Sequence, residues 1–394
     1  MRSVELFAGC GGLALGLAQA GFEHMLVVEL DDHAYAALEA NKPLVPEMAK
    51  WPLIRGDVRD VDYTGITSAI DLVAGGPPCQ PFSIGGKHLG PQDERNMWPE
   101  AIRAVRMLRP KAFLFENVRG LLRPAWRPYL EYLMLALSWP ELEAKSGEEW
   151  DSHAERLRQH AGTTKLHSSS YKVVVRPIDT ADYGAPQKRH RAIIIGVRAD
   201  VATDWSFPKA THSVESLAWA QMVNGSYWAK HNLDAAQCRS QVSDKMVGIA
   251  ERTERMLCPP MEQPWVTVRD ALADLPEPTV ESEPLTNHRL RLGARAYRKH
   301  TGSVLDEPAK AIKAGDHGVP GGENMLALPN GGVRYFTIRE MARLQGFPDS
   351  YIFAEGWKRP IKQIGNAVPV QVGKALGESV AGILKKSKKY SAAA

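Results

Sequence analysis

The chain has 394 residues, a formal net charge of +4 and a sequence pI near 8.7; 44% of its residues are apolar and 24% are charged. This length exceeds the usual size of a single hydrophobic core, so two domains, or one domain with a large insertion, are expected. The composition excludes a disordered chain, no apolar run approaches the ~20 residues of a membrane span, and a strand at the very start leaves no room for a signal peptide. We therefore expect a cytoplasmic protein.

Short apolar strands alternate with helix-length segments along the first half of the chain. The expected strands are residues 3–7, 25–29, 53–55, 71–74, 112–115, 171–176 and 191–197. This alternation predicts an α/β fold with a doubly wound, mostly parallel sheet, in which the last two strands form an antiparallel edge. The alternation stops after residue 198, which predicts a second, irregular domain.

The turn after the first strand, FAGCGG at residues 7–12, is rich in glycine. Glycines between a strand and a helix let the backbone approach a ligand and direct N–H groups toward it. Glu29 follows Gly9 by 20 residues, where nucleoside sites place a carboxylate for ribose hydroxyls, and Asp57 ends the third strand. Together these signals favour a binding site for a nucleoside cofactor over the alternative that the glycines only form a tight turn. The chain has no Gly-x-x-x-x-Gly-Lys-[Ser/Thr] sequence, which argues against a nucleoside triphosphate.

Cys79 lies in the sequence GGPPCQPFS at residues 75–83, just past the carboxyl end of the fourth strand. Two glycines and three prolines around one thiol fix its backbone, which favours a nucleophile over a buried structural cysteine. Glu116 ends the fifth strand, where a carboxylate costs free energy unless it is paired or takes part in chemistry. Beside Cys79, general acid chemistry is a better interpretation than a helix cap or a salt bridge. The four cysteines form no Cys-x-x-Cys pair, so neither a disulfide framework nor a metal site is expected.

Two arginines lie in the basic run QKRHR at residues 187–191. In an extended chain Arg189 and Arg191 point to the same side, which favours binding of a phosphate-bearing substrate over a plain surface charge run. Farther along, residues 337–344 and 370–384 have a helical period. The sequence QIGNAVP at residues 363–369 is expected to form a glycine turn that leads into the last helix.

In their order and spacing these blocks closely resemble those of the DNA (cytosine-5) methyltransferases of the bacterial modification-enzyme type. The blocks are FAGCGG, GGPPCQPFS, ENV, QKRHR, REMARLQGFPDSY and QIGNAVPV. The resemblance implies a Rossmann-like catalytic domain of the S-adenosylmethionine-dependent type at residues 1–198 and a smaller, irregular DNA target-recognition domain at 199–335. A hinge and helix block would follow at 336–358, and a segment at 359–394 would return to the catalytic domain.

The resemblance also implies which residues bind S-adenosylmethionine and its product S-adenosylhomocysteine, without a metal. The glycine turn and Glu29 would line the methionine and ribose parts, and Asp57 would face the adenine amino group. The implied cofactor-binding residues are Phe7, Ala8, Gly9, Gly11, Gly12, Glu29, Leu30, Asp57, Val58, Pro78, Asn366 and Ala367. Ala367 stands where some relatives have serine, so one side-chain contact to the cofactor would be missing there.

For the reaction, the resemblance implies that Cys79 adds to C6 of cytosine, because C5 accepts a methyl group only after the ring becomes an enamine. Glu116 would hold the N3/N4 edge of the base, and Arg191 would lie over O2 near the thiolate. Asn117 would position the loop of Cys79, and Arg189 would hold a backbone phosphate. The base must leave the duplex stack to be reached.

Duplex DNA is the expected partner of a monomer, with no membrane contact and with a cognate restriction endonuclease acting separately. Residues 288–300 carry five cations and no acid, which suits contact with phosphates or guanine; the alternative is a solvated basic helix. The glycine-rich residues 310–324 are expected to enter a groove of the DNA, or to form an ordinary connection. The expected DNA-binding residues are Ser83, Lys87, Arg95, Arg289, Arg291, Arg295, Arg298 and Lys313.

Two other functions stay open at this point. A transfer-RNA branch of the same family shares the Cys79 and Glu116 blocks, although the long variable segment favours DNA. A catalytically silent DNA-binding regulator is the second alternative, and the intact Cys79, Glu116 and Arg191 argue against it. An N4-cytosine or N6-adenine enzyme would have no use for the nucleophilic cysteine.

Overall fold

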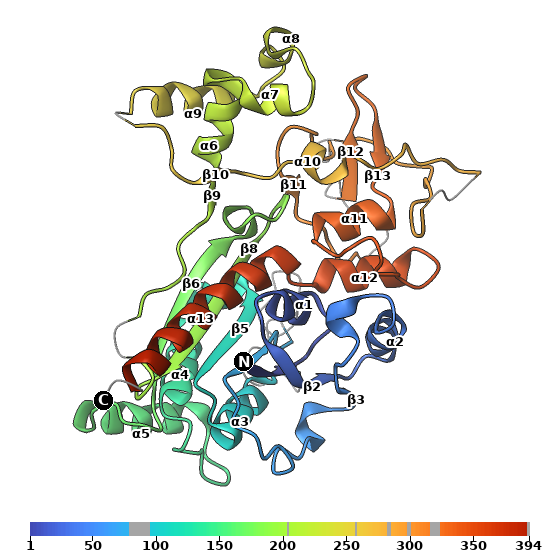
Figure 1. Ribbon diagram of the computed structural model, residues 1–394. Coiled ribbons are helices and arrows are strands. Elements are labelled where there is room, and N and C mark those ends of the chain that lie inside the picture. The colour runs from blue at the N-terminus through green and yellow to red at the C-terminus, as the bar shows by residue number, and fades with distance from the viewer. Residues whose placement is uncertain are drawn as a thin grey trace. The chain divides into compact units, whose positions relative to one another are not determined.

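Figure 1 shows the computed structural model, which describes residues 1–78, 95–202, 205–256, 258–281, 285–297, 301–315 and 324–391, with side chains as far as residue 386. The chain forms two compact units. The first comprises Met1–Ile178, His190–Pro208 and Gly373–Ala394, and the second comprises Asp179–Arg189 and Lys209–Val372. The second unit thus includes residues 179–189 and 336–372 in addition to most of the predicted recognition domain. None of the described helices is long and apolar enough to cross a membrane.

The first unit is built on a seven-stranded sheet with the strand order β3-β2-β1-β4-β5-β8-β6. The strands are β1 (Arg2–Leu6), β2 (Glu23–Glu29), β3 (Leu53–Arg55), β4 (Leu72–Gly75), β5 (Ala112–Val118), β6 (Tyr171–Asp179) and β8 (His190–Arg198). The strands β1 to β5 pair in parallel, whereas β8 is antiparallel to β5. The seven expected strands are therefore confirmed, because their β-branched and apolar runs mark buried strands clearly.

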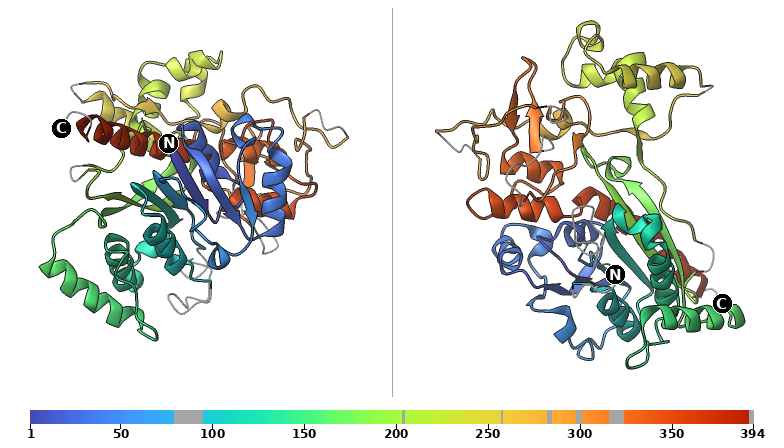
Figure 2. Two further views of the ribbon diagram at one scale, coloured as in Figure 1. Left: turned by 60° about the horizontal axis from the view of Figure 1, so that its bottom comes forward. Right: turned by 180° about the vertical axis from the view of Figure 1, so that it is seen from behind.

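Helices cover both faces of this sheet. They are α1 (Gly12–Gln19), α2 (Asp32–Asn41), α3 (Trp98–Leu108), α4 (Arg127–Ser138), α5 (Trp150–Thr163) and α13 (Val370–Ser391), whose first residues belong to the second unit. The helix α1 and the later part of α13 lie on one face, and α3 and α4 lie on the other (Figure 1, Figure 2). Because Gly377 has no side chain, α13 packs closely on α1: a Cβ there would lie 2.8 Å from Ala20 Cβ.

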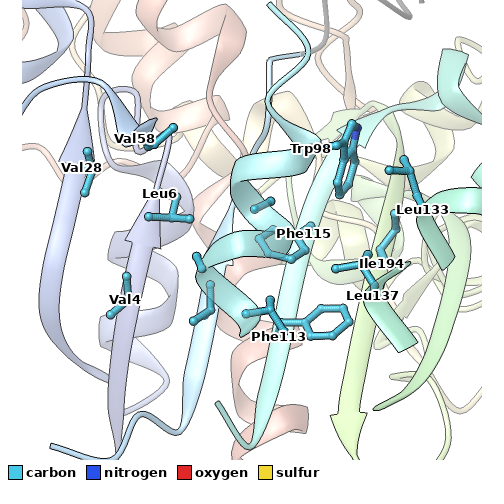
Figure 3. Packing of buried hydrophobic residues seen from close by; sticks show 14 of the residues in the cluster. Val4, Leu6, Val28, Val58, Trp98, Phe113, Phe115, Leu133, Leu137 and Ile194 are labelled. Atoms are coloured by element: carbon cyan, nitrogen blue, oxygen red, sulfur yellow. The ribbon is translucent and has the colours of Figure 1, made fainter. Parts of the chain in front are cut away.

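Apolar side chains of the strands, α3 and α4 form the main core of the first unit (Figure 3). The helix α3 buries Trp98, Ala101 and Val105 on one face, at helical spacing. Trp98 meets Phe115 of β5 edge to face, with ring centroids 5.8 Å apart. This close packing holds rigid the strands whose carboxyl ends carry the predicted site.

The second unit contains short helices and two-stranded ladders. Its helices are α6 (Val214–Ala218), α7 (Ser226–Lys230), α8 (Ala235–Arg239), α9 (Asp244–Glu254), α10 (Val268–Leu272), α11 (Ile338–Leu344) and α12 (Lys358–Asn366), with a π-helical turn at Trp219–Val223. Its strands are β7 (Gln187–Lys188), β9 (His212–Ser213), β10 (Gln263–Pro264), β11 (Ala309–Lys310), β12 (Met325–Ala327) and β13 (Val333–Tyr335). As predicted, this segment has no repeated β-α units, although residues 214–254 form short helices around a hydrophobic core of their own. Three of these helices have only 5 residues, too few to show a period in the sequence.

One alternative is excluded, and one local prediction was wrong. Residues 288–296 form no helix, which excludes the alternative of a solvated basic helix. Gly365 does not form a turn: it lies in the last turn of α12, where a Cβ would lie 2.3 Å from Ala314 N. A glycine needed for close backbone approach was thus mistaken for a turn glycine. The helices expected at 337–344 and 370–384 are confirmed by α11 and α13.

Candidate active site

The five parallel strands of the first unit, β1 to β5, end at the same edge of the sheet. The strand β1 lies between β2 and β4. The strands β2 and β3 follow on one side of β1, and β4 and β5 follow on the other, so the strand order reverses at β1. Open α/β sheets bind ligands outside the carboxyl ends of their strands at such a reversal. The residues predicted for the cofactor and for catalysis in this unit follow or end β1 to β5, except Arg191, which lies near the start of the antiparallel β8 opposite the end of β5, so the fold brings them to one edge.

The turn after β1 has an unusual backbone. Phe7, Gly9 and Gly11 have φ angles of 56°, 57° and 83°. This left-handed conformation is costly for a residue such as Phe7, and strain of this kind concentrates at functional sites. Gly11 is needed for space as well, since a Cβ would lie 2.8 Å from Leu38 Cδ2. The Leu38 contact is a constraint that sequence reasoning missed, because nothing in the local sequence indicates it.

Glu29 is the last residue of β2, and backbone groups orient its carboxylate. Oε2 accepts a hydrogen bond from Gly9 N at 2.6 Å, and Oε1 accepts one from Asp31 N at 2.7 Å. Burial raises the pKa of Glu29, and these two N–H groups offset part of that rise. The next residue, Leu30, is 62% exposed. An oriented carboxylate beside an exposed apolar side chain suits a ribose and the base attached to it.

Asp57 follows β3 and begins the 3-10 helix Val58–Asp60. Its Oδ1 accepts a hydrogen bond from Arg59 N at 2.9 Å, and its Oδ2 accepts one from the Arg59 guanidinium at 2.5 Å. That guanidinium lowers the pKa of Asp57, so the carboxylate is ionised at neutral pH. Val58 is buried, and a ligand here would meet its backbone and the Asp57 carboxylate.

The segment between β4 and Cys79 is fixed by the neighbouring strand β5, although Cys79 itself lies outside the described residues. Asn117, which is 1% exposed, donates a hydrogen bond from Nδ2 to Pro77 O at 3.1 Å. A Cβ at Gly76 would lie 3.3 Å from Glu116 Oε2. Gly76 therefore leaves room for the Glu116 carboxylate, a role that the sequence did not reveal.

Glu116 and Arg191 form an ion pair at the end of β5. Arg191 Nε lies 2.5 Å from Glu116 Oε1, and the two side chains are 14% and 11% exposed. The pairing of β5 with β8 sets Val118 opposite Arg191, which brings the two charged side chains together. Arg191 also donates a hydrogen bond from an NH1 group to His190 O at 2.8 Å. An acid and a guanidinium are thus held in one orientation beside the segment that leads to Cys79.

Cys10 is a second thiol at this edge, in the glycine turn. It is 1% exposed, and burial raises the pKa of its thiol to about 12. A thiol with that pKa is protonated at neutral pH and is not a nucleophile. Cys10 is therefore a packing residue of the turn.

Arg189 differs from its prediction. Its side chain is 5% exposed, and its NH1 and NH2 groups donate hydrogen bonds to Ile312 O at 3.1 Å and to Gly365 O at 2.5 Å. These contacts lie within the second unit and leave the guanidinium without access to a DNA phosphate. The prediction that Arg189 and Arg191 together bind a phosphate was therefore wrong. Arg189 has a structural role, because its guanidinium is buried among carbonyl groups that accept its hydrogen bonds.

The remaining predicted residues fall into two groups. Asn366 is exposed at the end of α12, and Ala367, directly after it, is 8% exposed. Arg289, Arg291 and Lys313 are also exposed in the second unit, where the Arg291 guanidinium lies 4.7 Å from the centroid of the Trp357 ring. Exposed positions are also found for Arg95 and Arg295, whereas Ser83, Lys87 and Arg298 lie outside the described residues.

Comparisons with known proteins agree over nearly the whole chain. A family model described as C-5 cytosine-specific DNA methylase matches residues 1–138 and 152–382. The chain is 31% identical over 387 residues to the Type II methyltransferase M.PspPI of Psychrobacter, covering 98% of this chain and 80% of the relative. It is 31% identical over 389 residues to the Type II methyltransferase M.Eco47II of Escherichia coli, with the same coverage. A solved structure of Spodoptera frugiperda DNMT2 shares the fold, with a TM-score of 0.56, 15% identity and coverage of 96% of this chain and 99% of that one.

Proposed function

Because the chain belongs to the C-5 cytosine-specific DNA methylases, we propose that it transfers a methyl group from S-adenosylmethionine to C5 of a flipped-out cytosine in duplex DNA. The reaction runs through a covalent bond between the Cys79 sulfur and C6. The observation that carries this proposal is the Glu116–Arg191 pair, held beside the segment to Cys79 by the Asn117–Pro77 hydrogen bond.

The edge of the sheet in the first unit fits S-adenosylmethionine. A Cβ at Gly9 would meet nothing within 4 Å, so the turn faces open space where the methionine part can lie. Glu29 would accept hydrogen bonds from the ribose hydroxyls, and Asp57 would accept one from the adenine amino group, beside the exposed Leu30. When bound, this cofactor supplies an electrophilic methyl group.

The residues of the chain make C5 of cytosine nucleophilic. The Cys79 thiolate gives its electron pair to C6, and the electrons of the C5–C6 double bond move through C4 to N3, which takes a proton held by Glu116. Without the base, Arg191 pairs with the ionised Glu116 carboxylate. When the base enters, Arg191 turns to O2 of the base, and Glu116 takes up from solvent the proton that it passes to N3. After methylation a base removes the C5 proton, the C5–C6 double bond forms again, and the thiolate leaves. An unperturbed thiol is only a few per cent ionised at pH 7, so the site must stabilise the Cys79 thiolate.

The biological role that we propose is the modification half of a restriction–modification pair. Support comes from the printed names of the two relatives at 31% identity, both Type II methyltransferases. The enzyme acts as a monomer on duplex DNA, and the endonuclease acts separately on the same sequence.

Sequencing of methylated cytosine in a plasmid from cells that express the chain tests the proposal, with Cys79→Ala as the control. We expect methylcytosine at one short recurring motif, and none at that motif with Cys79→Ala. Methylation retained in Cys79→Ala would contradict the covalent step. Unmodified DNA together with methylated transfer RNA would favour the transfer-RNA activity instead.

A further inference from the structure

The segment that carries the exposed arginines of the second unit is attached to the segment that precedes α12. Asn287 donates a hydrogen bond from Nδ2 to Phe353 O at 3.1 Å, and its Oδ1 accepts one from Phe353 N at 2.8 Å. The next residue, His288, is fully buried, and its Nδ1 lies 2.9 Å from Thr337 Oγ1. The backbone directly before Arg289 is therefore fixed to the body of the second unit.

A cation–π contact continues this attachment at the surface. The Arg291 guanidinium lies over the Trp357 ring, 4.7 Å from its centroid, and the Tyr335 ring meets Trp357 edge to face at 5.7 Å. The ring attracts the cation, while the exposed Arg291 keeps access to solvent. Because Trp357 directly precedes α12, Arg291 lies beside the first turn of this helix.

The first turn of α12 has an unfavourable charge. Lys358 and Arg359 are its first two residues, both are exposed, and the helix contains no acidic residue. The helix dipole favours acids at this end and disfavours cations. No acid in the described part of the chain pairs with Lys358 or Arg359. These two cations therefore do not stabilise the fold, which favours a role for them in contact with another molecule.

The two segments that meet at Trp357 carry a local excess of positive charge. Residues 287–297 contain three arginines, residues 353–362 contain two lysines and one arginine, and Glu355 is the only acid in either segment. This local excess of five positive charges is larger than the net charge of +4 of the whole chain. A partner that fits this surface must therefore be strongly anionic.

Duplex DNA has the charge density that such a surface requires, with one phosphate per about 1.7 Å of helix axis. Lysine binds phosphate as a compact charge on a flexible stem, and arginine binds it with a planar fork of N–H groups. Contacts of this kind hold a protein on the duplex and do not read its sequence.

We propose that Lys358 and Arg359 contact the phosphate backbone of duplex DNA. This contact extends the DNA-binding surface beyond the predicted recognition domain at 199–335 to the first turn of α12, and Trp357 joins the two parts through Arg291. The inference deepens the proposed function and rests on it, because that function supplies duplex DNA as the substrate.

The test compares Lys358→Gln/Arg359→Gln with Lys245→Gln/Arg252→Gln in the full-length protein. The control residues are exposed on α9 of the same unit, and both double variants remove two positive charges. The readout is the Kd of a fluorescent duplex, measured by anisotropy at several salt concentrations. One duplex carries the methylated motif, and a second has the same length and a scrambled sequence.

We expect Lys358→Gln/Arg359→Gln to reduce the salt slope of log K by about 1.8, which corresponds to two lost phosphate contacts. At about 0.1 M salt, binding of both duplexes should weaken by the same factor, at least about tenfold. The control should keep the slope within about 0.5 of the wild type. An unchanged slope in Lys358→Gln/Arg359→Gln, an equal loss in the control, or weaker binding of the motif duplex alone overturns the inference.

Thermal unfolding distinguishes DNA contact from a structural role. Glutamine at positions 358 and 359 removes cations from the end of the helix where the dipole disfavours them, so the unfolding midpoint should stay the same or rise. A lower midpoint would show that the two cations stabilise the fold, and it would overturn the inference.

The inference and the proposed function fail in different ways. A wild type that leaves duplex DNA unmethylated contradicts the proposed function. A wild type that methylates duplex DNA, together with an unchanged salt slope in Lys358→Gln/Arg359→Gln, contradicts only the contact made by α12.

Discussion

Glu116 and Arg191 carry opposite charges on side chains that are 11% and 14% exposed. Each charge has lost most of its hydration, and the partner compensates for that loss. Removing one member of a fully buried pair costs about 3–5 kcal/mol, because the other charge stays behind without compensation. The pair is therefore sensitive to substitution in both stability and chemistry.

Glu116→Gln is expected to slow methylation by about 10²–10⁴-fold, since the amide cannot supply a proton to N3. It should also lower the free energy of unfolding by about 3 kcal/mol, at the low end for a buried pair because both side chains keep some exposure. Single-turnover methylation and urea unfolding measure the two effects. Glu131→Gln removes an exposed pair with Arg127, 53% and 79% exposed, and should change stability by less than about 0.5 kcal/mol. A Glu116→Gln enzyme with the wild-type rate would rule out the acid role.

His24 gives the stability of the first unit a dependence on pH. Nε2 of His24 lies 2.8 Å from Ala14 O, Nδ1 lies 3.0 Å from Ser3 Oγ, and burial lowers the pKa of His24 from 6.5 to about 4. The unfolded chain therefore binds this proton more readily than the folded one. The resulting stability is fully present above pH 6.5 and is lost as pH falls toward 4, by up to about 3 kcal/mol. Urea unfolding between pH 6.5 and 4 measures this loss. The free energy of unfolding should fall less in His24→Gln than in the wild type, and an equal fall in both proteins would show that His24 is not the group responsible.

Within the helices, two glycines should respond to alanine in opposite directions. Intrinsic helix propensity favours alanine over glycine by about 1 kcal/mol. In α13, a Cβ at Gly382 would meet nothing within 4 Å, so Gly382→Ala should raise the free energy of unfolding by up to about 1 kcal/mol. In α12, a Cβ at Gly365 would lie 2.3 Å from Ala314 N, so Gly365→Ala should destabilise the second unit despite its better propensity. Thermal unfolding of both variants measures the difference, and a stabilised Gly365→Ala would show that Ala314 yields without cost.

The elements of the first unit were predictable, whereas those of the second were largely not. The strands β5 and β8 are continuous runs of apolar residues, and such runs identify a buried sheet in a single sequence. The helices α6, α7 and α8 have 5 residues each and depend on packing around Trp228, which no local pattern encodes. The roles of Gly365 and Arg189 depend on Ile312 and Ala314, which are more than 50 residues away in sequence and cannot be inferred from local spacing.

For the molecule as a whole, DNA binding should depend on a few local cations, because the net charge is only +4. Replacing Arg289, Arg291 and Arg295 together by glutamine should weaken duplex binding. It should also reduce the salt slope of log K by about 0.9 for each phosphate contact that is lost. Arg291 should contribute least to the slope, because its guanidinium lies over the Trp357 ring. Titrations at several salt concentrations measure the slope.

A control for this experiment removes the same charge from the first unit. Arg127, Arg158 and Lys165 are exposed there, and their replacement by glutamine should leave the slope within about 0.5 of the wild type. If both triple variants behave alike, the contact surface on the second unit is disproved and only net charge matters. If neither differs from the wild type, the DNA interface lies elsewhere on the chain.

The close packing of α13 on α1 has a consequence for biosynthesis. The last strand of the sheet, β8, ends at Arg198, whereas Gly373 and Gly377, which contact Leu13 and Leu17 of α1, are synthesised about 175 residues later. At ordinary translation rates, α13 is synthesised on the order of ten seconds after the last strand of the sheet, so the face that carries α1 stays uncovered for that time. During that interval α1 is exposed and the first unit is incomplete. Chains that terminate before Gly373 therefore leave this face of α1 uncovered and are exposed to chaperones and proteases.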